Sequence, residues 1–278
     1  MKKIIHLSDL HLGTNKRIDG ALTTIITNLR AFKEKASQYV IVVTGDLVNN
    51  ANNNKHQMIK SYFDELKAIG FTIFVVPGNH DYGNGISGKR KFVNIFKSIF
   101  FEDEELQYPK VDFVPDPNFP DNPDETIAFI GMDSMAEELG LLDHLFAEGE
   151  LGESQLNRLN EILSRSDVLA CGKRVLYMHH HPFDPTFLHQ LKDSGKLKQV
   201  IAAHIQSGTT IDALLYGHNH EGQRHPGMWG VLRCYDGSSA TGKVKHKLQP
   251  ILQRVIDLKQ EPETDYSGDF HIPKSSAV

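Results

Sequence analysis

The chain has 278 residues, of which 40% are hydrophobic and 23% are charged. This composition is typical of a folded globular protein and excludes a disordered one. The net charge of −5 leaves no excess of positive charge for coating a nucleic-acid backbone, so nucleic-acid binding is not expected.

The first part of the chain alternates between strand-like and helix-like patterns. Short apolar or β-branched runs predict strands at Lys3–Leu7, Tyr39–Val43 and Phe71–Val76. Between them, apolar residues recur at helical spacing from Ile18 to Phe32 and from Lys55 to Ile69. Strands separated by amphipathic helices predict a layered α/β core with a mostly parallel sheet.

The rest of the chain continues this alternation around one irregular stretch. A helix is expected from Lys89 to Phe101, and Pro115–Pro123 contains too many prolines for a helix interior or a central strand. We therefore expect a surface excursion near 102–125 within one domain of residues 1–258, followed by a polar tail at 259–278. Further strands are expected at Thr126–Met132, Arg174–Met178, Ile211–Tyr216 and Val231–Tyr235, and further helices at Glu153–Ser164 and Thr186–Ile205.

Neither export nor a membrane span is expected from the apolar runs. The run from Ile4 to Leu7 is too short for the core of a signal peptide, and no run approaches the roughly 18 residues of a membrane-spanning helix. Cys171 and Cys234 stand far apart without metal-binding spacing. They favour buried thiols in a reducing cytoplasm, where we expect the protein to be located.

Polar clusters rich in Asp, Asn and His follow five of the predicted strands. Because ligands bind outside the carboxyl ends of the strands in open α/β sheets, side chains from these loops can meet at one place. Each cluster alone has an ordinary interpretation as a turn, a cap or a surface feature, but together they favour a shared site. The clusters are Asp9-Leu10-His11, Gly45-Asp46, Gly78-Asn79-His80-Asp81, His179-His180-His181 and Gly217-His218-Asn219-His220.

The residue types in these clusters indicate a site for two metal ions. Carboxylate oxygens, imidazole nitrogens and an amide oxygen suit Mn, Fe or Zn, and the absence of cysteine argues against a structural thiolate zinc. Asp9 and His11 are two residues apart, as are His218 and His220. If strand geometry continued through them, each pair would project to one side of its strand.

The ordered motifs SDLH, TGD, PGNHD, MHHHP and GHNH resemble those of the calcineurin-like metallophosphoesterase superfamily over about residues 4–240. They are most similar to its cyclic-nucleotide phosphodiesterase branch, class III. The resemblance implies an α/β fold, a four-layer αββα sandwich with two metals at the strand ends. It assigns one metal to Asp9, His11, Asp46 and His220, and the other to Asp46, as the bridge, with Asn79, His179 and His218.

The same resemblance places His80 beside the metals and not on one of them. His80 would stabilise the transition state or protonate the leaving oxygen, and Asp81 would orient its ring. The run of three histidines leaves two registers open. Alignment with phosphodiesterases that share this run makes His179 the ligand, which we favour, whereas alignment on the following proline in more distant members makes His180 the ligand.

Polar residues outside the motifs have ordinary interpretations. Asp133 fits a carboxylate that supports the site and equally one that ends a strand, while Asp236, Ser238 and Ser239 favour a turn. The remaining histidines considered are expected to be structural or on the surface, namely His144, His189, His204, His225 and His246.

The resemblance implies a hydrolase of small phosphodiesters, of the cyclic-nucleotide or glycerophosphodiester type. Two metals lower the pKa of a shared water for in-line attack at phosphorus and clamp the attacking and leaving oxygens. Protein Ser/Thr phosphatases typically have an arginine where this chain has Pro77, which weakens that assignment. A phosphomonoesterase or nuclease of the same superfamily is the alternative, and a non-catalytic protein-binding scaffold is disfavoured because every ligand position is filled.

Overall fold

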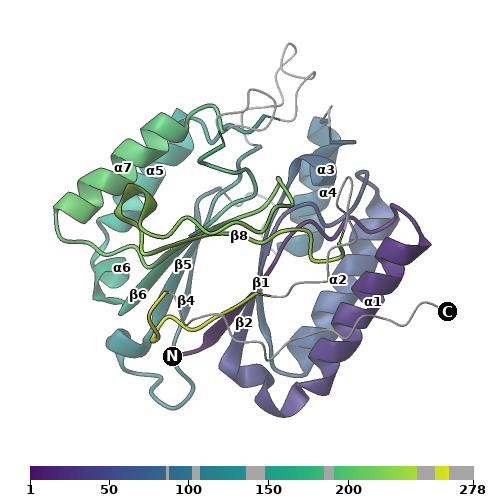
Figure 1. Cartoon of the computed structure of the whole chain (residues 1–278), viewed down its shortest axis with the longest axis horizontal. Helices are drawn as coiled ribbons and strands as arrows, with labels where there is room; N and C mark the ends of the chain where they lie inside the picture. Colours follow the sequence, from purple (N-terminus) through teal and green to yellow (C-terminus); the bar gives the residue numbers. More distant parts are fainter. Residues whose placement is uncertain (86–87, 102–106, 136–147, 185–190, 243–253, 263–278) are drawn as a thin grey trace.

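Two β-sheets packed face to face carry the strands of the protein (Figure 1). The computed structural model describes residues 1–85, 88–101, 107–135, 148–184, 191–242 and 254–262. In the first sheet, of order β3-β2-β1-β9, the first three strands of the chain run parallel and β9 pairs antiparallel with β1. Its strands are β1 (Lys3–Leu7), β2 (Tyr39–Thr44), β3 (Thr72–Val76) and β9 (Arg254–Ile256).

The second sheet has the order β4-β5-β6-β7-β8. Strands β5 to β8 are parallel, and β4 pairs antiparallel with β5 at one edge. The strands are β4 (Lys110–Val114), β5 (Ile127–Gly131), β6 (Lys173–Tyr177), β7 (Ala213–Tyr216) and β8 (Arg233–Asp236).

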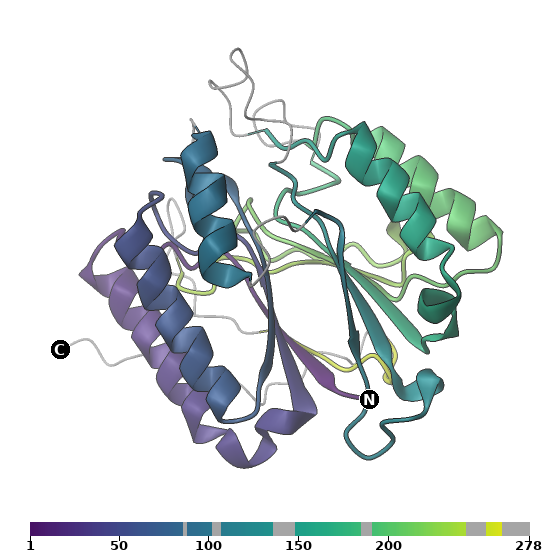
Figure 2. The same ribbon diagram turned by 180° about the vertical axis from the view of Figure 1, so that it is seen from behind.

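Helices cover the outer face of each sheet, as the view from behind shows (Figure 2). The first sheet is covered by α1 (Lys16–Ala31), α2 (Asn53–Ala68) and α4 (Arg90–Phe100), and the second by α5 (Glu153–Leu163), α6 (Ser166–Ala170) and α7 (Ser194–Gln206). None of the described helices is both long and apolar enough to cross a membrane. The short elements are α3 (Asn79–Tyr82) and the 3-10 helices η1 (Lys33–Gln38), η2 (Pro123–Glu125) and η3 (Met228–Gly230).

Three apolar cores separate these layers. Because successive residues of a strand point to opposite faces, Ile5 and Ile41 join the core beneath α1 and α2, whereas Ile4 and Val40 join the core between the sheets. The third core, which includes Leu176, lies between the second sheet and its helices. The predicted four-layer αββα sandwich is therefore confirmed.

Two short edge elements depart from the predicted pattern. Residues Lys110–Val114, inside the predicted surface excursion, form β4, so that part of the prediction was wrong. An edge strand tolerates the neighbouring Pro109 and Pro115 because they do not interrupt a central ladder.

Strand β9 was not predicted at all. The chain close to its described end pairs with β1 near its beginning, which supports the proposal of one domain; residues 263–278 of the predicted tail lie outside the described residues.

The last predicted helix begins later than expected. Residues 185–190 lie outside the described residues, and α7 begins at Ser194 and not at Thr186. The buried Asp193 carboxylate accepts hydrogen bonds from the main-chain N–H groups of Leu151 and Gly152. This tertiary contact holds the residue before the helix in a non-helical conformation, which helical periodicity alone does not reveal.

Candidate metal centre

The predicted site residues follow the carboxyl ends of five parallel strands. Asp9, Asp46 and Asn79 lie just after β1, β2 and β3 of the first sheet, and His179 and His218 lie just after β6 and β7 of the second. Since the two sheets are packed face to face with these ends at one edge of the sandwich, both halves of the chain contribute to one place (Figure 1).

Asp9, His11 and His220 form the first group of donor atoms. The Nε2 atom of His220 lies 3.0 Å from Asp9 Oδ1 and 3.1 Å from His11 Nε2. His11 Nε2 lies 3.7 Å from Asp9 Oδ1 and 3.7 Å from Asp46 Oδ2. These atoms are close enough together to hold one metal ion.

Asn79, His179 and His218 form the second group. His179 Nε2 lies 3.0 Å from Asn79 Oδ1 and 3.2 Å from His218 Nδ1. It also lies 3.5 Å from Asp46 Oδ1. The carboxylate of Asp46 therefore has one oxygen toward each group, which is the arrangement that a bridging ligand requires.

Hydrogen bonds select the atoms that face this centre. The Nδ1 atom of His179 donates to the main-chain oxygen of Thr44 (2.8 Å), which leaves the lone pair of Nε2 directed inward. The Nδ2 atom of Asn79 donates to the main-chain oxygen of Gly85 (2.7 Å), which leaves Oδ1 directed inward. Both orientations present a lone pair, as a metal ligand must.

The spacing of the donor atoms fits coordination of borderline divalent ions. Ligand atoms about 2.1 Å from one ion lie about 3.0 Å apart at right angles and about 3.4 Å apart at the tetrahedral angle. The separations of 3.0–3.2 Å between the closest donors of each group match this range. Each close pair of imidazole nitrogens can share a proton as a hydrogen bond, and with a lone pair on both nitrogens the same pair suits a cation between them.

The charges of the buried carboxylates lead to the same inference. Burial raises the pKa of Asp46, and the imidazoles of His179 and His80 oppose this only in part. Burial also raises the pKa of Asp9, but His220, His179 and His11 together outweigh it, and the pKa of Asp9 lies below its ordinary value. Two carboxylates this close and this deeply buried need compensating positive charge, which bound metal ions supply.

The backbone is left-handed and not extended at five of the seven predicted ligands. Strands β1 and β7 end at Leu7 and Tyr216, so strand geometry does not extend through the Asp-x-His and His-x-His pairs. The hydrogen bond from the Asp9 N–H to the Gly45 oxygen, and that from the His11 N–H to the Asp46 oxygen, hold the turn after β1. The φ angles are positive at Asp9 (52°), His11 (49°), Asp46 (53°), His218 (77°) and His220 (60°).

His80 lies at the edge of the centre with its ring held by the main chain. Its Nδ1 atom donates to the main-chain oxygen of Asn49 (2.6 Å), and its Nε2 atom lies 3.9 Å from Asp46 Oδ2. His80 also belongs to a group with His11 and Asp46 that could hold an ion. The prediction that His80 acts beside the metals, and not as a ligand, stays a prediction.

Asp81 does not orient His80, so that predicted role was wrong. Within the described part of the chain its buried carboxylate accepts hydrogen bonds from the main-chain N–H groups of Leu47 and Gly78 and from the side chain of His56. It points into the protein, because α3 begins at Asn79 and turns the side chain of Asp81 back toward β2. The main-chain oxygen of Asn49 holds the His80 ring instead.

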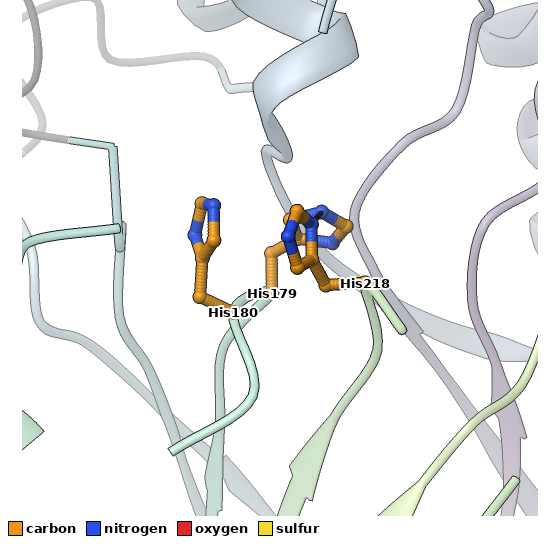
Figure 3. Close-up of side chains that lie close together, drawn as sticks. All are labelled: His179, His180 and His218. Atoms are coloured by element: carbon orange, nitrogen blue, oxygen red, sulfur yellow. Dashed lines mark hydrogen bonds between the residues drawn. The ribbon is translucent and has the colours of Figure 1, made fainter. Parts of the chain in front are cut away.

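The three histidines of the HHH run point to different places. Figure 3 shows His179 and His218 directed toward one another, with His180 beside them. The Nδ1 atom of His180 bonds with the Ser134 hydroxyl (2.8 Å), although His180 could also join His179 and His218 around an ion. His181 packs against Tyr216, and burial lowers its pKa to about 4. The geometry supports His179 as the ligand.

Other polar residues hold the loops and lie away from the donor atoms. Asp133 accepts hydrogen bonds from the Tyr82 hydroxyl and the Met135 N–H, and burial raises its pKa to about 6. Asp236 accepts from the main-chain N–H group of Ser238 in its own turn, as expected for a turn residue, and also from those of Glu221 and Gly222 in the preceding loop. His204 bonds with Asn160 on α5. His144, His189 and His246 lie outside the described residues.

Sequence reasoning overlooked two buried residues next to the centre. The Ser8 hydroxyl donates to Asp9 Oδ2 (2.5 Å), and His56 bonds with Asp81 (3.1 Å). Ser8 stands inside a quoted motif but was given no role. His56 shares the buried face of α2 with Ile59 and Phe63, and a histidine at an apolar position of a helix was the signal that could have found it.

Comparisons with known proteins find a matching family model and similar relatives. A family model described as calcineurin-like phosphoesterase matches residues 2–222. The chain is 25% identical over 271 residues to a probable glycerophosphodiester phosphodiesterase, GpdQ, of Arcobacter nitrofigilis, covering 95% of this chain and 84% of the relative. It is 23% identical over 228 residues to the 3',5'-cyclic adenosine monophosphate phosphodiesterase CpdA of Haemophilus influenzae, covering 79% and 70%.

A solved structure supports the fold. The calcineurin-like phosphoesterase YfkN of Bacillus subtilis superposes with a TM-score of 0.51 at 13% identity, covering 87% of this chain and 82% of that protein.

Proposed function

Because this chain belongs to the calcineurin-like phosphoesterase family, we propose that it is a hydrolase of small phosphodiesters with a centre of two metal ions. The observation that carries this proposal is the position of Asp46, whose two carboxylate oxygens face two separate groups of donor atoms. Asp9, His11 and His220 would hold one ion, and Asn79, His179 and His218 the other, with Asp46 shared between them.

The ions would be Mn, Fe or Zn, in keeping with the mixed oxygen and nitrogen donors. When bound, such a pair lowers the pKa of a water molecule and polarises the phosphoryl oxygens of the substrate. When both ring nitrogens carry a proton, His80 would contribute the one on Nε2 to the leaving oxygen, since Nε2 faces the centre while the N–H of Nδ1 is held by Asn49. Ser8 would keep the carboxylate of Asp9 in place through its hydroxyl.

Two relatives with similar sequences support the substrate class that we propose. One is named for glycerophosphodiesters and the other for cyclic adenosine monophosphate, and both are small phosphodiesters. A cyclic nucleotide or a glycerophosphodiester is therefore our proposed substrate. The buried, free thiols of Cys171 and Cys234 support a reducing compartment such as the cytoplasm.

A substrate panel assayed with Mn tests this proposal. It contains bis-p-nitrophenyl phosphate, cAMP, a glycerophosphodiester, p-nitrophenyl phosphate and single-stranded DNA. We expect turnover of the small diesters to exceed that of the monoester and of the DNA, to be lost with EDTA and to return with Mn. Preference for p-nitrophenyl phosphate or DNA would favour the alternative phosphomonoesterase or nuclease. Full activity in EDTA, with no metal bound, would overturn the proposal.

A further inference from the structure

A buried pair of side chains, His56 and Asp81, lies behind the predicted ligands. His56 Nε2 is 3.1 Å from Asp81 Oδ1, and neither residue is exposed to solvent. His56 comes from α2, whereas Asp81 belongs to α3 after the third strand. No ligand or catalytic role proposed above uses this pair.

The surroundings of His56 fix which of its nitrogens carries the proton. Its ring meets the edges of Phe96 and Phe100, with ring centroids 5.8 and 6.0 Å away. Its Nδ1 atom is buried and has no hydrogen-bond partner among the described residues. A proton on Nδ1 would have no acceptor, so the proton is on Nε2, which donates to Asp81.

The carboxylate of Asp81 joins the loops that follow β2 and β3. Its Oδ1 accepts from the main-chain N–H of Leu47 (3.0 Å), the residue after Asp46. Its Oδ2 accepts from the main-chain N–H of Gly78 (2.9 Å), the residue before Asn79. Hydrogen bonds to an ionised carboxylate are shorter and stronger than neutral ones. One side chain thus ties the residue next to the predicted bridging ligand to the residue next to the predicted amide ligand.

We propose that His56 and Asp81 are a positioning pair, which sets the separation between Asp46 and Asn79 that metal binding requires. The inference rests on the proposed metal centre. His56 supplies the only side-chain donor to Asp81 among the described residues, and it anchors the carboxylate to α2. Groups that orient metal ligands from behind contribute about 10- to 100-fold to metal affinity or activity.

Substitutions at position 56 separate positioning from plain core packing. The amide nitrogen of glutamine reaches close to the position of the histidine Nε2, whereas that of asparagine corresponds to Nδ1 and falls short of Asp81. His56→Gln therefore keeps the donor, and His56→Asn and His56→Leu remove it. His204→Leu is the matched control, because His204 is also a buried helical histidine with one side-chain partner, Asn160, and it lies in the other half of the molecule.

Two measurements on these variants test the pair. The first is amide hydrogen exchange of Leu47, Val48 and Gly78 in the metal-free protein, and the second is metal affinity by calorimetric titration with Mn. We expect His56→Leu and His56→Asn to speed exchange at these amides more than elsewhere in the sheet, and to weaken metal binding by about 10- to 100-fold. His56→Gln should restore most of both properties, and His204→Leu should change neither.

Three results would overturn the proposal. One is metal affinity in His56→Asn equal to that in His56→Gln. Another is exchange in the donor-free variants that rises uniformly over both sheets, which indicates general loss of stability. The third is an equal effect of His204→Leu. If His56→Leu does not fold, the asparagine and glutamine variants decide the outcome. Failure of the wild-type protein to bind metal would overturn the proposed function. Amide exchange in the metal-free protein would still test whether His56 and Asp81 hold the two loops.

Discussion

Gly85 is a position where adding one methyl group should damage the centre. Its main-chain oxygen holds the amide of Asn79, and its φ is +88°. A Cβ atom at this position would lie 2.4 Å from His80 Nε2 and 2.5 Å from its Cε1. Gly85→Ala therefore forces either the His80 ring or the loop that orients Asn79 to move.

The expected magnitude comes from two separate contributions. A left-handed backbone at a non-glycine residue costs about 1–2 kcal/mol of folding free energy. Relief of the contact requires a shift of about 1 Å, from 2.4 Å to the ordinary contact distance, and a misplacement of that size can lower the rate about 100-fold. Gly208→Ala separates the two, because Gly208 has φ +95° but nothing within 4 Å of an added Cβ atom.

The assay compares kcat on cAMP and on bis-p-nitrophenyl phosphate, metal stoichiometry and the thermal unfolding midpoint of both variants. We expect a similar loss of stability in both, and a loss of about 100-fold in kcat for Gly85→Ala alone. Equal activity of the two variants would refute the reasoning, because it would show that the contact with His80 has no effect on turnover.

Four further predictions concern single side chains. Asp46→Asn should remove most activity and lower the number of bound metals measured by elemental analysis; near-normal turnover with two metals would contradict the bridging role. His179→Ala should lower metal occupancy while His180→Ala acts mainly on turnover, and metal loss in His180→Ala alone would shift the register by one residue. His80→Ala should keep both metals and lose about 10²- to 10⁴-fold in kcat on cAMP, with a smaller loss on bis-p-nitrophenyl phosphate, whose leaving group needs no proton; an equal loss would assign His80 to phosphoryl charge, and loss of a metal would make it a ligand. The folded-state pKa of Asp133 is raised to about 6, so between about pH 4 and 6 the folded protein binds more protons than the unfolded chain. As the pH rises through this range, the unfolding free energy of the wild type should fall by up to about 3 kcal/mol relative to that of Asp133→Asn. Parallel pH–stability curves in denaturant unfolding would contradict this.

Local sequence patterns were sufficient to predict the central strands and the order of the predicted ligands. The run of β2 is buried along its whole length, and such continuous apolar runs predict parallel central strands. Asp46 stands directly beyond this run, so its place at the strand end followed from the same pattern. The position of each motif at a strand end could be predicted without tertiary contacts, because each motif lies next to a strand that is easily predicted.

Features that depend on distant contacts were beyond such patterns. Strand β9 is three residues long and pairs with a strand more than two hundred positions earlier, so its own residues carry no periodic signal. The orientation of Asp81 depends on main-chain donors from another loop. Asp and His adopt positive φ more often than most residues, but still uncommonly, so the left-handed backbone at Asp9 and His220 also depends on distant contacts such as the hydrogen bond from the Asp9 N–H to the Gly45 oxygen.

At five of the predicted ligands, the left-handed backbone that places the donor atoms also lowers the stability of the fold. At about 1–2 kcal/mol for each residue, the conformations of Asp9, His11, Asp46, His218 and His220 together oppose folding by an amount comparable with the whole stability of an ordinary domain. Glycine at any of them would relieve this strain and stabilise the fold, but it would remove a donor atom. A variant of this chain that does not need to bind metal would therefore gain stability from glycine at these positions.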